Sequence, residues 1–296
     1  MHRRTTKWDI AFNGSNFILL AAMTLMCLYP FYYIIIYSIS DPVQALRGIA
    51  FLPRGFTLET YVKILQLEDI SHAFFISITR TVIGSTVTVG CSTFFAYLVT
   101  RDDMPYRSLV YRIVIASTYL HAGMIPNYLL IKHIGLRDSF LVYIIPGLIS
   151  AYFVILVKTY IESLPKSLEE SAMIDGATTR QIFMSVIFPL CKPIVATISV
   201  FSVVGDWNSY MDNYLYVNNP NLNTIQLLLY KYMQQAQSFV SLSREDMENM
   251  TPGQYNITPE TVRMTITVVV TLPIMFVYPF FQRFFVKGIM MGSVKG

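Results

Sequence analysis

The middle of the chain holds the sequence Leu168-Glu169-Glu170-Ser171-Ala172-Met173-Ile174-Asp175-Gly176-Ala177, which continues to Val186-Ile187-Phe188-Pro189. It is the most polar helix-forming stretch of a very apolar protein, and it lies between two apolar stretches, residues 139–158 and 189–209. Each of these has about the 20 residues that a helix needs to cross a bilayer. We therefore expect a charged helix–Gly–helix element at a membrane surface, where a soluble partner can contact it.

The composition places the whole chain among membrane proteins. Hydrophobic residues make up 54% of the 296 residues and charged residues only 14%, against about 25% charged residues in soluble domains. The apolar blocks do not alternate with polar residues, as the strands of a membrane β-barrel do. The composition therefore predicts an all-α, polytopic protein in contact with membrane lipid. The net charge of +4 is small and does not indicate nucleic-acid binding.

Six apolar stretches are long enough to be transmembrane helices, at residues 17–38, 74–99, 109–131, 139–158, 189–209 and 263–282. Basic residues precede the first stretch, but its apolar run is too long for a signal peptide, so we expect it to be retained. The second stretch contains Gly84-Ser85-Thr86-Val87-Thr88-Val89-Gly90. Because small residues let helices approach closely in lipid, this helix is expected to lie inside the bundle.

The distribution of Lys and Arg predicts the orientation of these helices. With the N-terminus inside, the short cytoplasmic segments are rich in basic residues, as the positive-inside rule requires; they include Arg101, Arg107, Arg112, Lys158 and Lys166. Both chain ends are then cytoplasmic. We divide the chain into an N-terminal segment with the first span and an external loop (1–72), a transmembrane domain with a cytoplasmic loop at 162–189 (73–285), and a cytoplasmic tail (286–296).

Two of the expected external segments, residues 41–72 and 209–262, are too long to be simple connections. Residues 53–61 indicate a turn that leads into a short amphipathic helix, and residues 227–237 indicate a further helix. Loops of this length commonly bind or cover something. A solvated, partly mobile loop is the alternative for residues 209–262.

Several catalytic signatures are absent from the sequence. It contains no G-x-x-x-x-G-K-[ST] loop for ATP and no H-E-x-x-H metal motif. Cys27, Cys91 and Cys191 lie in or beside apolar blocks, with no spacing typical of disulfide frameworks or zinc sites. The sequence therefore predicts no enzyme, no metal and no cofactor held by this chain. No acid lies at the centre of a span, which disfavours an ion-coupled secondary transporter without excluding it.

A polar and aromatic cluster lies near the outer end of the fifth span, formed by Asp206, Trp207, Asn208, Tyr210 and Asn213. Aromatic faces flanked by amide and carboxylate groups suit a substrate path, in particular one for a carbohydrate. Helix–helix hydrogen bonds and interfacial anchoring explain the same residues equally well, so both interpretations stay open. For Arg80 and His121, which lie in or near other spans, the hydrogen-bonding interpretation is favoured.

The central stretch resembles a known motif. Glu170-Ser171-Ala172, Gly176 and Val186-x-Phe188-Pro189 are similar, at matching spacing, to the E-A-A…G…I-x-L-P motif of permease subunits of bacterial ABC importers. Tyr29-Pro30, Trp207-Asn208 and the C-terminal residues 278–296 resemble the carbohydrate-uptake branch, and within it the maltose-permease G-type subunit. Residues 78–84 and 262–264 resemble the subgroup assigned to oligosaccharides and polysaccharide fragments.

The resemblance implies a type I ABC importer permease fold that moves a carbohydrate across the bacterial cytoplasmic membrane by alternating access. It implies four kinds of partner: a second permease subunit in a heterodimer, two ATP-binding subunits that hold ATP and Mg, an extracytoplasmic solute-binding protein, and the carbohydrate itself. An ABC permease for a non-sugar solute is the alternative within the same class.

The resemblance also implies two contact sites for the ATPase subunits. The first is the central loop, where we expect helices at 169–174 and 177–186, a corner at Gly176 and a helix cap from Asp175; its candidate residues are Glu169, Glu170, Ser171, Ala172, Asp175, Gly176 and Ala177. Glu170 is expected to pair with a basic residue of the ATPase. The second is the tail, with Lys287, Gly288, Lys295 and Gly296.

Overall fold

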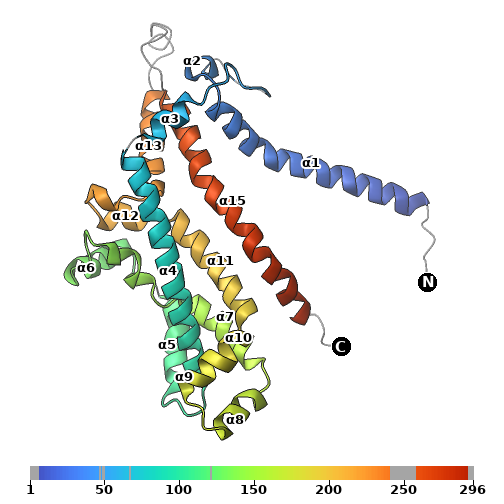
Figure 1. Cartoon of the computed structure of the whole chain (residues 1–296), viewed down its shortest axis with the longest axis vertical. Coiled ribbons are helices and arrows are strands. Elements are labelled where there is room, and N and C mark those ends of the chain that lie inside the picture. Colours follow the sequence, from blue (N-terminus) through green and yellow to red (C-terminus); the bar gives the residue numbers. More distant parts are fainter. Residues whose placement is uncertain are drawn as a thin grey trace. The chain divides into compact units, whose positions relative to one another are not determined.

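The structure, a computed structural model, describes residues 7–46, 48, 51–66, 68–120, 122–240 and 258–292. Helices form almost all of the secondary structure in these ranges, and the single β-bridge there joins Ser40 and Phe56. The all-α prediction is therefore confirmed (Figure 1). The chain forms two compact units, which are Met1–Leu67 with Lys231–Thr271 (unit 1) and Glu68–Tyr230 with Leu272–Gly296 (unit 2).

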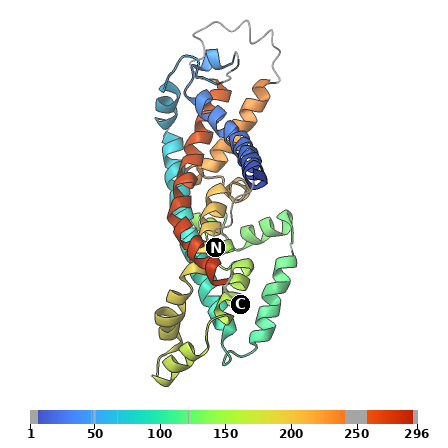
Figure 2. The same cartoon turned by 90° about the vertical axis from the view of Figure 1, so that its right-hand side faces the viewer.

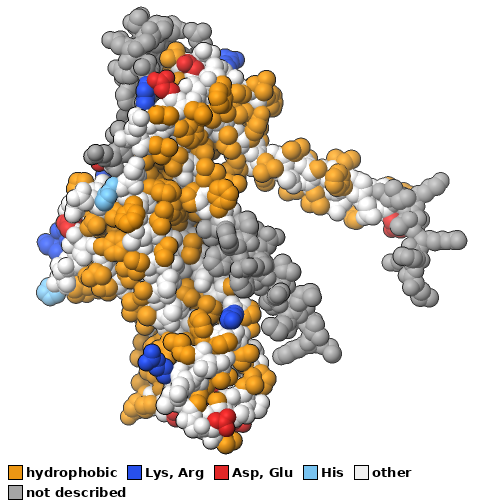
Figure 3. All heavy atoms as spheres, in the orientation of Figure 1, with side chains coloured by type: hydrophobic (Ala, Val, Ile, Leu, Met, Phe, Trp, Pro, Cys, Tyr) orange, Lys and Arg blue, Asp and Glu red, His pale blue; other side chains and the backbone are white. Residues whose placement is uncertain are grey.

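Unit 1 begins with the long helix α1 (Lys7–Ser38), whose apolar part is long enough to cross a membrane. Hydrophobic side chains cover much of its surface in Figure 3. The chain then turns into α2 (Pro42–Ala45), which Asp41 caps by accepting bonds from two backbone amides, and into α3 (Glu59–Leu65). The expected turn and short amphipathic helix are thus present, and the Ser38 and Tyr61 hydroxyls, 2.7 Å apart, join α1 to α3.

Unit 2 is organised around α4 (Glu68–Thr100), which packs most extensively against α7 (Ala151–Glu162) and α11 (Lys192–Asn208). Figures 1 and 2 show these helices side by side. Small residues of α4 are buried there: Ser92 Oγ accepts a bond from the Ser150 amide at 3.0 Å, and Thr88 donates to the Gly147 carbonyl at 2.8 Å. The expectation that this helix lies inside the bundle is confirmed.

The core of unit 2 lies where α4, α7 and α11 meet the segment before α11. Because lipid is as apolar as these side chains, van der Waals packing, and not transfer from water, is the main favourable term that holds such helices together. The buried members of the cluster are Val89, Ala96, Tyr97, Phe153, Val154, Val157, Ile161, Ile182, Phe183, Ile187, Cys191 and Ile198.

The third expected span is wrong as a continuous helix. Residues 109–131 fall into α5 (Arg107–Tyr119) and α6 (Met124–His133). Gly123 between them has φ +86°, and Pro126, which lacks a backbone N–H, sits in the first turn of α6, where that loss is tolerated. These two helix-breaking residues outweigh the apolar composition on which the prediction rested.

Two described helices qualify as membrane spans by length and composition, Ala11–Ser38 and Asp69–Thr100, and up to four do if each of two bent pairs is one span. The bent pairs are Phe140–Gly147 with Ala151–Glu162, at 44°, and Thr179–Leu190 with Lys192–Asn208, at 81°. The number of six spans and the positions of the termini therefore stay predictions.

The remaining elements of unit 2 are short, apart from the two helices that continue into unit 1, α13 and α15. Their bounds are Phe140–Tyr143 (η1), Ile145–Gly147 (η2), Ser167–Ile174 (α8), Thr179–Ile182 (α9), Phe183–Ile187 (η3, a π-helix), Phe188–Leu190 (α10), Met211–Tyr216 (α12), Pro220–Leu222 (η4), Ile225–Val240 (α13) and Pro259–Gly292 (α15). Helix α13 agrees with the helix expected at 227–237. Both views place α8 and α9 at the end of unit 2 where α4 terminates (Figures 1 and 2).

Candidate functional site: the central loop and a cavity

The central loop, residues 162–189, forms the expected helix–Gly–helix. Helix α8 ends at Ile174, Gly176 has φ +75°, and α9 starts after Thr178. A Cβ on Gly176 would meet nothing within 4 Å. The glycine is therefore needed for its backbone conformation, which L-residues rarely adopt, and not for space.

The expected role of Asp175 as the cap of the second helix is wrong. Asp175 ends α8, and Thr178 caps α9 in a capping box, with the Thr178 hydroxyl bonded to the Gln181 amide and the Gln181 side chain bonded to the Thr178 amide. Thr178 has the extended backbone that an N-cap needs, at ψ 157°. The T-x-x-Q spacing in the sequence is the signal that would have identified it.

The loop has an inner and an outer face. Ala172 and Ala177 are partly buried and pack against the core cluster of unit 2. Glu170, Ser171 and Asp175 are exposed. Small side chains thus allow the loop to lie close to the core, and its charged groups remain available to another protein.

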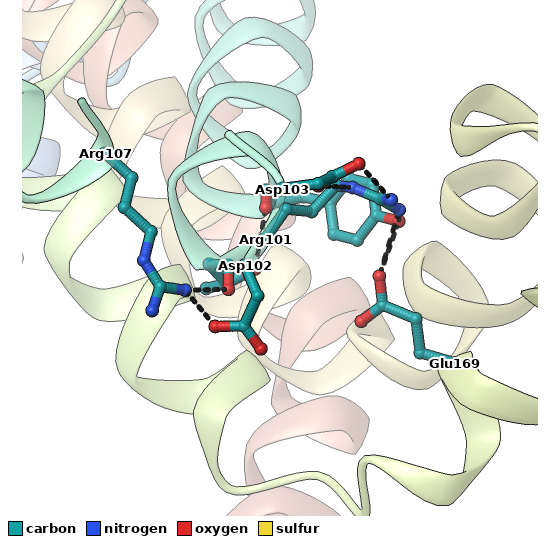
Figure 4. A network of polar contacts seen from close by, with 7 residues as sticks. Arg101, Asp102, Asp103, Arg107 and Glu169 are labelled. Atoms are coloured by element: carbon teal, nitrogen blue, oxygen red, sulfur yellow. Dashed lines mark hydrogen bonds and ion pairs between the residues drawn. The ribbon is translucent and has the colours of Figure 1, made fainter. Parts of the chain in front are cut away.

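Glu169 lies between these faces and is bonded within the chain. Its Oε1 accepts a bond from the Tyr97 hydroxyl at 3.0 Å and one from Arg101 Nη1 at 3.1 Å (Figure 4). The two neighbouring glutamates therefore differ: Glu169 holds α8 against the end of α4, whereas Glu170 is exposed.

Arg101 is itself held by a second carboxylate. Its Nε and Nη2 donate to the two carboxylate oxygens of Asp103, each at 2.7 Å, and its Nη1 donates to the Tyr97 hydroxyl at 2.9 Å. The hydrogen bonds to Asp103 raise the pKa of Arg101, and the same bonds lower the pKa of Asp103. The beginning of α5 has a separate pair, Arg107 with Asp102 (Figure 4).

Sequence reasoning missed this network. From the sequence, Arg101 and Arg107 were used only as basic residues that predict the orientation of the chain in the membrane, and Asp103 was not considered. The run Arg101-Asp102-Asp103 directly after a span was the available signal, because opposite charges this close bind one another in a tight turn. The pairing with Glu169, 68 residues further along the chain, has no local signal.

A cavity of about 630 Å³ lies in unit 2 against α4 and α11. Its lining is mainly apolar, with hydroxyl groups from α4 and α11. The lining residues are Ile78, Thr81, Val82, Ser85, Thr86, Val89, Gly90, Phe188, Ser199, Val203, Trp207, Pro273 and Ile274. Of the five residues expected on a substrate path, Trp207 lines this cavity, with its indole edge-to-face on Phe74 at 5.8 Å.

The other four expected path residues do not line this cavity. Asp206 is half-buried beside Gly84, where a Cβ would lie 3.2 Å from its Oδ2, and Asn208 accepts a bond from Gln226 at 3.3 Å. Tyr210 stacks on Tyr230 at 4.7 Å.

Asn213 is fully buried, which favours the hydrogen-bonding interpretation of this residue over a place on a substrate path. Its Oδ1 accepts bonds from the Thr224 amide at 2.7 Å and the Thr224 hydroxyl at 3.1 Å. It fixes the start of α13 against α12. In the sequence, Asn213 is a short polar residue beside aromatic residues, and this pattern does not distinguish a structural role from a binding role.

Arg80 is buried inside unit 2 and has the hydrogen-bonding role that was expected of it. It donates to the two Asp212 carboxylate oxygens at 3.2 and 2.6 Å and to the Ser209 carbonyl at 3.3 Å. Its guanidinium also lies 4.5 Å from the centre of the Tyr143 ring. Arg80 therefore joins α4 to the corner between α11 and α12.

The C-terminal candidates are only partly described. Lys287 and Gly288 belong to α15, which continues to Gly292, so the helix extends beyond the predicted start of the tail at 286. Lys295, Gly296 and His121 lie outside the described residues.

Comparisons with known proteins agree with this geometry. The sequence model of the family described as "Binding-protein-dependent transport system inner membrane component" matches residues 15–291. The chain belongs to this family. As an inner membrane component, it is a transport subunit, and the resemblance inferred from the central motif is confirmed at this level.

Individual members of the family are similar over nearly the whole chain. The polygalacturonan/rhamnogalacturonan transport system permease protein YtcP of Bacillus subtilis is 36% identical over 283 residues, covering 95% of this chain and 96% of that protein. Protein LplC of the same organism is 32% identical over 292 residues, covering 98% and 97%.

Two solved structures share the fold. One chain of a bacterial ABC transporter involved in the import of the acidic polysaccharide alginate matches with a TM-score of 0.84 and 28% identity, over 96% of this chain and 99% of that one. A second chain, from a structure of the bacterial alginate ABC transporter in complex with an alginate pentasaccharide-bound periplasmic protein, matches with a TM-score of 0.55 and 15% identity.

Proposed function

We propose that this chain is a permease subunit of an ATP-driven importer for oligosaccharides or polysaccharide fragments. The observation that carries the proposal is the match to a chain of an alginate importer over nearly the full length of both chains, with a TM-score of 0.84. The 36% identity to a permease named for polygalacturonan and rhamnogalacturonan supports the same substrate class.

The chain's partners are proposed to be a second permease subunit, an extracytoplasmic solute-binding protein and two ATPase subunits that bind ATP and Mg. ATP hydrolysis then belongs to the ATPase subunits, and this chain supplies the surface that responds to it. The exposed outer face of the central loop (residues 162–189), which we call the coupling loop from here on, supports that assignment, and its exposed Glu170 can pair with a basic group. Because an exposed ion pair contributes only about 0–1 kcal/mol, most of the coupling depends on the packed shape of the loop.

Transport is proposed to proceed by alternating access across the bacterial cytoplasmic membrane. Six spans with cytoplasmic termini place the coupling loop inside and the segments 41–72 and 209–262 outside. The sugar then passes between this subunit and its partner permease. Trp207 and the hydroxyl groups on the cavity wall are this chain's candidates for the path, and the C-terminal residues contact the ATPases.

The test is reconstitution of the full importer in proteoliposomes, with its binding protein outside and ATP inside. The substrate panel compares oligogalacturonides and alginate oligosaccharides with a neutral maltooligosaccharide. We expect saturable uptake of at least one sugar that requires both ATP and the binding protein. Uptake driven by an ion gradient without ATP would contradict the proposal, and uptake restricted to a non-sugar solute would refute the carbohydrate assignment.

A further inference from the structure

Glu169 of α8 contacts Tyr97 and Arg101 at the end of α4. The role inferred for this contact rests on the proposed permease function. We propose that Glu169 is a positioning residue: its contact with Tyr97 and Arg101 fixes the coupling helix α8 to α4, so that a movement of α8 displaces α4. Glu169 would then act inside this chain, and only Glu170, of the two glutamates, would act toward the ATPase.

The contact joins three elements at one side chain. Tyr97 is fully buried near the end of α4, and its hydroxyl bonds Glu169 of α8 and Arg101. Its ring stacks on Phe183, in the π-helix that follows α9, with the ring centres 5.4 Å apart and the planes inclined by 29°. A displacement of either helix of the coupling loop therefore reaches Tyr97 through a packed or hydrogen-bonded neighbour.

The contact is partly shielded from water. The side chains of Arg101 and Glu169 are 10% and 23% exposed, and Figure 4 shows Arg101 reaching between Asp103 and Glu169. Asp103 holds the guanidinium in place with two parallel bonds, which leaves Nη1 directed at Glu169 and Tyr97. Hydrogen bonds between charged groups are roughly twice as strong as neutral ones.

A second ion pair between the same segments makes a useful contrast. Lys166, just before α8, lies 3.6 Å from Asp102, but these side chains are 82% and 72% exposed. Exposed pairs are screened and contribute little. Of the ion pairs described between the end of α4 and the α8 segment, the Arg101–Glu169 pair is the one that is shielded. We therefore assign to this pair the role of fixing α8 to α4.

Helix α4 connects this contact to the cavity. It is one continuous helix from Glu68 to Thr100, and residues of its middle turns, including Ser85 and Val89, line the cavity. At 1.5 Å per residue, Val89 lies roughly 17 Å along the helix from Thr100. A rigid helix of that length moves as a unit, so displacement of its end changes the wall of the cavity.

The test measures sugar molecules imported per ATP hydrolysed by the full reconstituted importer. Glu169→Gln removes the charge, and Tyr97→Phe removes the shared hydroxyl while keeping the ring on Phe183. We expect each variant to lower the ratio of sugar imported to ATP hydrolysed about tenfold, as for the loss of one charge-assisted hydrogen bond. Because both changes break the same contact, the ratio of the double variant should not fall below that of the more impaired single variant. The matched control is Asp102→Asn, which removes the charge from the exposed pair with Lys166 between the same segments and should leave the ratio within about twofold.

The outcomes distinguish failure of the positioning role of Glu169 from failure of the proposed permease function. A wild-type ratio in Glu169→Gln or Tyr97→Phe, or losses that multiply in the double variant, would overturn the positioning role and leave the permease role intact. An equal loss in Asp102→Asn would also overturn it, because the effect would then not be specific to the shielded Arg101–Glu169 pair. Should Glu169→Gln fail to assemble, Tyr97→Phe alone decides. Absence of ATP-driven uptake in the wild-type importer would overturn both proposals before any variant is measured.

Discussion

Helix α4 contains one arginine and is followed directly by another, and the two side chains lie in different surroundings. Arg80, inside the helix, has a side chain that is 3% exposed and binds Asp212, which is 23% exposed. Arg101, just beyond the helix end, is 10% exposed and binds both Asp103, 64% exposed, and Glu169. Removing one partner of a buried pair leaves an uncompensated charge and costs about 3–5 kcal/mol. Around Arg101 it is the Asp103 carboxylate that lies largely in water, where a pair contributes about 0–1 kcal/mol. The first arginine therefore governs folding, and the second governs how the coupling loop is attached.

The largest effect is expected at the buried pair. Arg80→Met leaves the Asp212 carboxylate without its cation and should lower the free energy of unfolding by about 3 kcal/mol. The double variant Arg80→Met/Asp212→Asn should recover part of that loss, because the stranded charge is gone. Thermal unfolding of the detergent-solubilised complex measures both; an equal or lower stability in the double variant would contradict the distinction between the two arginines.

The next effect concerns the corner of the coupling loop. Gly176→Val forces a β-branched residue to φ +75°, which costs about 1–2 kcal/mol and favours a different loop geometry. We expect ATP hydrolysis in the reconstituted importer to become uncoupled from uptake, with α4 and its Arg80 pair intact. The control is Gly176→Asn, since asparagine tolerates this backbone conformation. If valine and asparagine behave alike, the positive φ is not what the loop requires.

The helix cap gives a smaller effect. Thr178→Ala removes the hydroxyl that caps α9 and should destabilise the loop by about 1 kcal/mol, with Thr178→Ser close to wild type. Asp175→Ala should have no comparable effect, because Asp175 does not cap α9. Hydrogen exchange of the α9 amides, followed by mass spectrometry, compares the three. Faster exchange in Asp175→Ala than in Thr178→Ala would restore the original assignment of the cap.

The smallest effect is a pH dependence at Asp103. The hydrogen bonds from Arg101 lower the pKa of Asp103 below its ordinary value of 3.8. A lowered pKa means that Asp103 contributes stability above pH 3.8, and that this contribution is lost as the pH falls through the lower folded value. The difference in melting temperature between wild type and Asp103→Asn should therefore shrink below pH 3.8. A difference that grows on acidification would contradict the Arg101–Asp103 pairing.

The parts of this structure that were predictable from the sequence depend on local patterns. The polar residues 168–177 and the glycine at 176 identified the helix–Gly–helix of the central loop, and the small residues of α4 identified the central helix. The break between α5 and α6 also has a local cause, at Gly123 and Pro126. It was not predicted because the prediction relied on the apolar composition of residues 109–131.

The partners of buried polar groups were not predictable. Arg80 and Asp212 are 132 residues apart, and Arg101 and Glu169 are 68 apart. The residue type of such a side chain does not show whether it binds a neighbour in the fold or a substrate. Asn213, expected on a path and found buried against Thr224, shows that a single sequence does not separate the two roles.

ATPase subunits are proposed to act on this chain through the coupling loop. Cross-linking in the full complex tests this contact, with Ile174→Cys, 86% exposed on α8, in a Cys27→Ser background that removes the exposed native thiol. A thiol-linked photoreactive probe at residue 174 should capture the ATPase subunit, and the same probe at Asn218→Cys should not. Capture of the ATPase from residue 218 but not from residue 174 would show that the ATPase subunits contact the other end of this chain and not the coupling loop.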